Sequence, residues 1–116
     1  MNIYLAGPMT GYPQFNFPAF MAAAKKLRAQ GRTVFNPAEN DMEVHGEDFG
    51  KDNDTGDVAL AEETAGFSLR DALKTDLSWI CDNADGIAML PGWEDSKGAK
   101  AEHALAYALG LEMYYM

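Results

Sequence analysis

The chain has 116 residues, of which 47% are hydrophobic and 23% charged, so it is long enough for one folded domain and too short for two cores. Its net charge of −9 comes from residues 39–63, which hold ten acidic side chains and one basic one. A protein that binds duplex nucleic acid would carry a basic stripe, so that class is excluded.

The sequence shows neither a membrane span nor a signal peptide, and it has one cysteine. No apolar run approaches the roughly 20 residues that a membrane span needs, and the first residues, MNIYLAGPMTG, lack the basic start and long apolar stretch of a signal peptide. We therefore expect a cytoplasmic protein. The single cysteine, Cys81, excludes an internal disulfide and a cysteine-cluster metal site, and we expect it to be a small buried hydrophobe.

The first third of the chain reads as strand, helix, strand. Residues 2–6 form a short apolar run that predicts a buried strand, followed by a Gly-Pro turn. Apolar residues at helical spacing predict a helix with Asn16 as its N-cap and Gly31 beyond its C-terminus. Residues 33–35 predict a second strand.

The acidic segment 39–63 has no clear period and contains three glycines, so we expect a loop inserted into the domain, with short helical pieces near 58–64. After it, residues 69–83 predict an amphipathic helix, 87–90 a strand, 97–109 an alanine-rich helix and 111–115 a last strand.

Alternating strands and helices predict an α/β fold with a short parallel sheet and helices on both faces. Such sheets bind ligands beyond the carboxyl ends of their strands. The loops that follow those ends are 7–16, 36–68 and 91–97, so we expect them to build the site.

Two carboxylates lie on helix faces that should be buried. At about 100° per residue, Glu102 points between Leu105, Ala106 and Leu109, away from the face shared by Lys100, His103 and Tyr107. Asp76 falls within the apolar arc of the helix at 69–83. A buried, unpaired carboxylate is costly, so a fold keeps one where a cleft uses it.

Several uses of this pair remain open. Each carboxylate could be satisfied by a backbone N–H or a basic partner, or one or both could hold Mg²⁺. A third use is chemistry at an acetal-like carbon, where one carboxylate attacks the anomeric centre and another group manages the proton.

Other features are less specific. Ser96, Lys97 and Gly98 precede a helix N-terminus, which suits either an anion or a plain cap. Tyr12, Phe15 and Phe17 could stack on a base or belong to the core.

Four blocks resemble the nucleoside 2-deoxyribosyltransferase superfamily, in the same order along the chain: Ile3 to Met9, Asp76 to Ile80, Ala84 to Ile87, and Ser-x-Gly-Ala-x-x-Glu at 96–102. That group includes the deoxynucleoside 5′-monophosphate N-glycosidases. The nearest likeness is to a subfamily of short proteins of the domain-of-unknown-function type. The resemblance covers about 1–37 and 69–111.

The resemblance implies a single Rossmann-like (flavodoxin-like) three-layer domain over residues 1–116, with roles for matching positions. Glu102 matches the nucleophile that attacks C1′, Asp76 the aspartate that assists departure of the base, and Tyr4 the tyrosine that orients the nucleophile. Ser96 matches the serine that binds a 5′-phosphate. The expected substrate-binding residues are Gly7, Pro8, Met9, Asn36, Ser96 and Gly98.

These matches predict an enzyme that hydrolyses the N-glycosidic bond of a (deoxy)nucleoside 5′-monophosphate through a glycosyl-glutamate intermediate, without metal or other cofactor. The alternatives are a transferase that exchanges bases, a non-catalytic nucleotide-binding module, and an acidic interaction protein that mimics nucleic acid. We also expect a homo-oligomer, most simply a dimer, with Tyr107, Tyr114 and Tyr115 supplying apolar area.

Overall fold

A parallel sheet organises the part of the chain that the structure, a computed structural model, describes: residues 1–46, 56 and 68–116. Its strands run in the order β2-β1-β3-β4, and every neighbouring pair is parallel. In chain order the strands and helices are β1 (Asn2–Ala6), η1 (Pro13–Asn16), α1 (Phe17–Ala29), β2 (Thr33–Phe35), α2 (Pro37–His45), α4 (Leu69–Asn83), β3 (Gly86–Met89), η2 (Trp93–Asp95), α5 (Lys97–Ala108) and β4 (Glu112–Tyr115).

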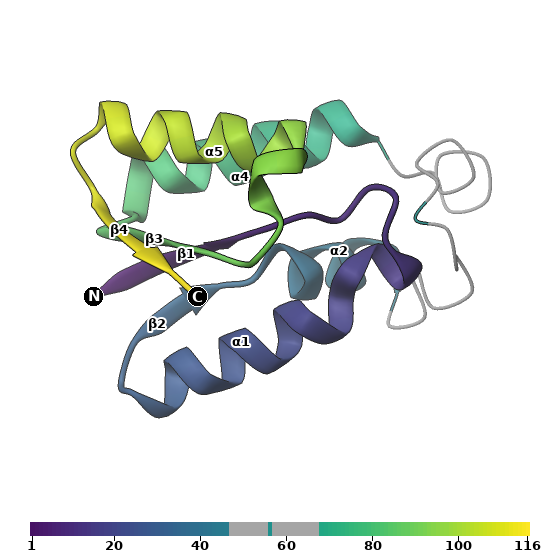
Figure 1. Cartoon of the computed structure of the whole chain (residues 1–116), viewed down its shortest axis with the longest axis horizontal. Helices are drawn as coiled ribbons and strands as arrows, with labels where there is room; N and C mark the ends of the chain where they lie inside the picture. The colour runs from purple at the N-terminus through teal and green to yellow at the C-terminus, as the bar shows by residue number, and fades with distance from the viewer. Residues whose placement is uncertain (47–55, 57–67) are drawn as a thin grey trace.

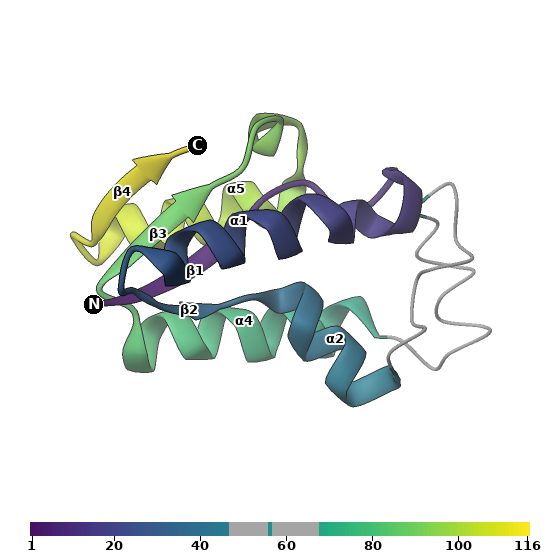
Figure 2. The same cartoon turned by 90° about the horizontal axis from the view of Figure 1, so that it is seen from below.

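Helices cover both faces of this sheet, which gives the three layers of a Rossmann-like α/β fold. Figure 1 shows α4 and α5 side by side above the strands and α1 below them, and Figure 2 shows the same layers from below. Within the described residues, no helix has the length and apolar character needed to cross a bilayer. The predicted fold class is confirmed.

Strand β1 divides the core into two halves because successive side chains of a strand point to opposite faces. Ile3 and Leu5 pack in the cluster that includes α1, whereas Tyr4 and Ala6 pack in the cluster with α4 and α5. These four side chains are at most 1% exposed. The central strand therefore places Tyr4 beneath the two helices that carry the predicted carboxylates.

The expected strands and the helix at 69–83 are confirmed, with ends that differ by at most one residue. The predicted N-cap position is confirmed, because Asn16 stands at the N-cap of α1, although its side chain makes no capping hydrogen bond and its φ is 62°. The prediction that Cys81 is buried is wrong. Cys81 is exposed, since its neighbour Ile80 takes the buried position on α4.

The prediction of a loop beginning at residue 39 is also wrong, because α2 spans Pro37–His45. The remainder of the acidic segment, including the helical pieces expected near 58–64, lies outside the described residues apart from Gly46 and Gly56. The Gly56 carbonyl accepts a hydrogen bond from Gly11 N at 2.9 Å. With φ of +65°, a Cβ there would lie 2.4 Å from the Tyr12 carbonyl oxygen, so the position requires glycine.

The three residues before α1 are not glycines, yet all three adopt the left-handed backbone conformation. Gln14, Phe15 and Asn16 have φ values of 54°, 52° and 62°. L-residues pay a steric cost in this region, so the turn stores strain. It delivers Phe15 into the core, where the ring is 4% exposed.

Candidate active site

A cavity of about 550 Å³ opens beyond the carboxyl ends of β1, β2 and β3. All three predicted loop regions contribute to its wall, so a cavity lies where the site was expected. The side chains discussed below belong to its lining, which comprises Tyr4, Gly7, Pro8, Met9, Thr10, Tyr12, Phe15, Phe20, Pro37, Asp41, Leu69, Ala72, Leu73, Asp76, Asp95, Ser96, Lys97, Gly98, Ala99 and Glu102.

A buried hydrogen bond joins β1 to α5 at the floor of the cavity. The Tyr4 hydroxyl donates to Glu102 Oε2 at 2.5 Å. Tyr4 is fully buried, and its ring stacks on Phe35 at 5.5 Å between centroids and lies 6.3 Å from Trp79. Because the ring is held on the sheet by these neighbours, its hydroxyl fixes the orientation of the glutamate.

Glu102 reaches the cavity because α5 begins at Ser96. The Ser96 hydroxyl accepts a hydrogen bond from Ala99 N at 3.2 Å, a serine N-cap. The buried alanines of this helix, Ala99 and Ala106, pack in the same cluster as Ile87 and Met89 of β3. Glu102 is 5% exposed, as its wheel position predicts. Leu109, expected on the same face, is 48% exposed because the helix ends at Ala108.

Burial raises the pKa of Glu102 to about 8. The hydrogen bond from Tyr4 opposes this rise by stabilising the carboxylate, while the charge of Asp76 adds to it. Burial also raises the pKa of Tyr4 well above its ordinary value, with further contributions from Glu102 and Asp76. Tyr4 therefore remains a hydroxyl donor at any physiological pH.

Asp76 approaches the same point from α4. Ser68 caps this helix by accepting a hydrogen bond from Asp71 N at 3.3 Å, and the carboxylate of Asp76 is 8% exposed. Burial raises the pKa of Asp76 to about 7, and its interaction with the Tyr4 hydroxyl limits the rise. A carboxyl that holds its proton near neutrality is suited to donate one.

A third buried carboxylate, Asp41, was missed by the sequence analysis. It comes from α2, lies in the wall of the same cavity and is 8% exposed. Burial raises its pKa to about 7, with the charge of Asp76 contributing. A helix signal was present in the sequence: Asn36 at the N-cap, Pro37 at the first position and Glu39 two residues later resemble a capping box.

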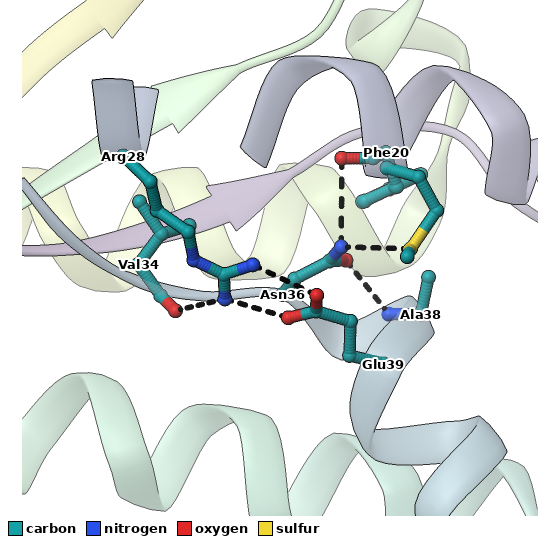
Figure 3. Close-up of polar contacts among 7 residues, drawn as sticks. Phe20, Arg28, Val34, Asn36, Ala38 and Glu39 are labelled. Atoms are coloured by element: carbon teal, nitrogen blue, oxygen red, sulfur yellow. Dashed lines mark hydrogen bonds and ion pairs between the residues drawn. The ribbon is translucent and has the colours of Figure 1, made fainter. Parts of the chain in front are cut away.

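Polar contacts on the far side of α2 hold that helix in place (Figure 3). The Asn36 side chain accepts a hydrogen bond from Ala38 N at 3.0 Å and lies 3.5 Å from the Phe20 carbonyl oxygen. Arg28 of α1 donates to both carboxylate oxygens of Glu39, at 2.8 and 2.6 Å. Asn36 thus positions α2 and is absent from the cavity lining, where it was expected to bind substrate.

The opposite end of the cavity is formed by the start of α5. Ser96 and Gly98, two of the expected substrate-binding residues, lie there together with Asp95 and Lys97. Lys97 is the one basic residue in the cavity lining of the described chain. The free N–H groups of a helix N-terminus and a lysine together favour a negatively charged ligand group.

Of the other residues expected to bind substrate or to stack on a base, some line the cavity and others belong to the core. Gly7, Pro8 and Met9 line the cavity. A Cβ at Gly7 would lie 2.7 Å from Leu90 Cβ, so this glycine permits close packing of β1 on the segment after β3. Tyr12 and Phe15 line the cavity, whereas Phe17 belongs to the α1 side of the core.

The chemical capacity of the arrangement follows from these groups. Two buried carboxyls with raised pKa values and a hydroxyl donor line the same cavity. Once Glu102 is ionised, this arrangement suits attack at a carbon that develops positive charge. Over residues 1–46, 56 and 68–116, no cluster of three or more His, Cys, Asp or Glu side chains is arranged to hold a metal ion.

Comparison with known proteins gave one match. Neither the curated proteins nor the solved structures contain one that matches the chain. A family model described as "Domain of unknown function (DUF4406)" matches residues 1–115. Since this match covers nearly the whole chain, the protein belongs to the DUF4406 family.

Proposed function

We propose that the protein cleaves the N-glycosidic bond of a nucleoside 5′-monophosphate, by way of a covalent glycosyl ester on Glu102. The observation that carries the proposal is the hydrogen bond from buried Tyr4 to Glu102 Oε2, with the buried carboxyl of Asp76 in the same cavity. The resemblance of these three residues to the nucleoside 2-deoxyribosyltransferase pattern supports the same assignment.

The reactive state has Glu102 ionised and Asp76 protonated, so Glu102 must first release the proton that its raised pKa favours. In the first step, a Glu102 carboxylate oxygen forms a bond to C1′ while the bond from C1′ to the base nitrogen breaks. The base leaves with the electron pair and receives a proton from Asp76. Tyr4 leaves Oε1 of Glu102 free for attack because it occupies Oε2. Positive charge develops on the sugar in this transition state, and buried carboxylates stabilise it because solvent screens their charges less than at the surface.

In the second step, water attacks C1′ and the ester bond to Glu102 breaks. Asp76, now ionised, accepts the proton from water, so both carboxyls return to their starting states. The products are the free base and a sugar 5-phosphate. If a second base attacks in place of water, the same intermediate gives base exchange, which makes hydrolase and transferase two outcomes of one site.

The 5′-phosphate is assigned to the start of α5. Lys97, the Ser96 hydroxyl and the free N–H groups of the first helical turn are the groups that attract an anion there. Asp95 opposes this attraction, so the net preference depends on the lysine and the helix together.

The test is incubation with a panel of nucleosides and their 5′-monophosphates, with chromatography for released base. We expect base release from a monophosphate, a loss of more than 10³-fold in Glu102→Ala, where the order of magnitude is that of losing a covalent step, and unchanged activity in Glu94→Gln, which alters an exposed glutamate. Mass spectrometry of quenched protein should find the sugar phosphate on Glu102.

Two results would overturn the proposal. Binding of a monophosphate without base release would identify a nucleotide-binding module. Retention of more than about a tenth of the rate in Glu102→Ala would exclude Glu102 as the nucleophile.

A further inference from the structure

Asp41 is a buried carboxylate that the proposed reaction does not use. It is 8% exposed and lines the cavity. Among the described residues no hydrogen bond to its side chain is present, and no fully buried side-chain oxygen or nitrogen lacks a partner, so the Asp41 oxygens open onto the cavity. A ligand group that enters there can donate a hydrogen bond to them. The carboxyl is therefore available to a ligand in the cavity.

The sheet order places Asp41 at the end of the cavity opposite the α5 N-terminus. Helix α2 follows β2 and α5 follows β3, while β1, which carries Tyr4, lies between these two strands. Two spacings of about 4.8 Å separate β2 from β3, so the two ends of the cavity are on the order of 10 Å apart. A nucleotide with its phosphate at α5 and its sugar above Tyr4 would direct its base toward α2.

Asp76 is near both of the other buried carboxyls in the cavity, because its charge raises the pKa of Asp41 and of Glu102. In the proposed reaction Asp76 donates its proton to the leaving base. Asp41, which comes from α2 and lines the same cavity, is therefore near an edge of that base.

The α2 end of the cavity offers a ligand a hydrogen-bond acceptor, the Asp41 carboxylate. In the described part of the lining, Asp41 is accompanied there by Pro37 of the same helix, whereas Leu73 lies against Gly98, and Lys97 is at the start of α5. A carboxylate only accepts hydrogen bonds. It satisfies the N–H groups of an exocyclic amine and repels a carbonyl oxygen placed at the same position.

We propose that Asp41 determines base specificity by accepting a hydrogen bond from an exocyclic amino group, so that the substrates are monophosphates of amino-bearing bases. The proposal rests on the function proposed above. Selection against the oxo analogue arises because a buried carboxylate facing a carbonyl oxygen loses its hydrogen-bond partner on binding.

The experiment compares kcat/KM for two matched pairs, deoxycytidine with deoxyuridine 5′-monophosphate and deoxyadenosine with deoxyinosine 5′-monophosphate, at pH 8. The members of each pair differ in an amino group against an oxo group. Wild type should favour the amino member of at least the better-cleaved pair by about tenfold or more. Asp41→Asn keeps the size of the side chain but adds an N–H₂ donor, so the ratio should fall to about one or invert.

A matched control is Glu43→Gln, which removes one negative charge from an exposed position on the same helix and should leave the ratio as in wild type. Equal ratios in wild type and Asp41→Asn, with base release intact, would overturn the role of Asp41 and leave the proposed function standing. A wild-type preference for the oxo member would overturn the specificity in the same way. Absence of base release from every monophosphate would overturn both proposals.

Discussion

Replacing Glu102 by glutamine should make the protein more stable at alkaline pH while it abolishes base release. The side chain keeps its size and still accepts the hydrogen bond from Tyr4. What disappears is the cost of ionising a carboxyl that is 5% exposed. A site that favours catalysis at the expense of stability is expected to behave in this way.

The sign and size of this effect follow from the pKa of Glu102. The carboxyl has an ordinary value of 4.5 and a folded-state value of about 8, so the folded protein retains a proton that the unfolded chain releases. Its contribution to stability is fully present below pH 4.5 and is lost as the pH rises through 8. The difference of about 3.5 pK units corresponds to a ceiling of roughly 5 kcal/mol. Because Asp76 and Tyr4 readjust when Glu102 ionises, we expect about 2 kcal/mol of the ceiling to be observed.

The assay is urea denaturation of wild type and Glu102→Gln at pH 5 and pH 9. The two proteins should differ little at pH 5, and the variant should be more stable at pH 9 by about 2 kcal/mol. Glu94→Gln, at an exposed position, should follow wild type at both values. A Glu102→Gln protein that is less stable than wild type at pH 9, with the same pH dependence, would show that the buried carboxylate stabilises the fold and refute this reasoning.

Three further changes test separate parts of the molecule. Asp76→Asn should lower the rate of base release by at least about 10²-fold, measured under saturating substrate; a fully active variant with higher stability would mean that Asp76 has no catalytic role. Ser96→Asp should shift the ratio of kcat/KM from the 5′-monophosphate toward the free nucleoside, because a second carboxylate at the start of α5 repels the phosphate; an unchanged ratio would remove the phosphate from that position. Gln14→Gly should raise the free energy of unfolding by about 1 kcal/mol and Tm by roughly 4 °C, since glycine adopts the left-handed backbone of that turn without steric cost; a lower Tm in a thermal melt would contradict the strain.

The sequence predicted the two carboxylates of the candidate site because each is a charged residue on a helix face that should be buried. Glu102 and Asp76 stand out because each occupies an apolar helix face, and both prove to be buried beside Tyr4. Strand β1 was recognisable from five consecutive residues without a charge. The role of Tyr4 in joining them could not be read from periodicity, since a tyrosine in a buried strand is an ordinary core residue.

Asp41 was missed for a physical reason. Helix α2 has only nine residues, and its apolar side chains form no clear stripe at helical spacing. Within a strongly acidic segment, the hydrophobic pattern therefore did not indicate a helix. Asn36 was expected as a substrate-binding residue, so its position at the N-cap of a helix was not used. Once the helix is assumed, Asp41 falls on the same face as Pro37 and Ala38, both buried, and would have been the third carboxylate on an apolar face.

The contacts that hold α2 allow the position of Asp41 to be changed by substitutions outside the cavity. Arg28 and Glu39 are partly exposed, with side chains 41% and 35% accessible, and exposed ion pairs contribute little to stability. Arg28 also donates to the Val34 carbonyl oxygen at 2.9 Å, which ties the pair to the end of β2 (Figure 3). Substitutions at these two positions could tilt α2, and Asp41 with it, without touching a residue that meets the ligand. Divergence in ligand preference among related chains can therefore accumulate at the back of α2, where changes are tolerated, before any cavity residue is replaced.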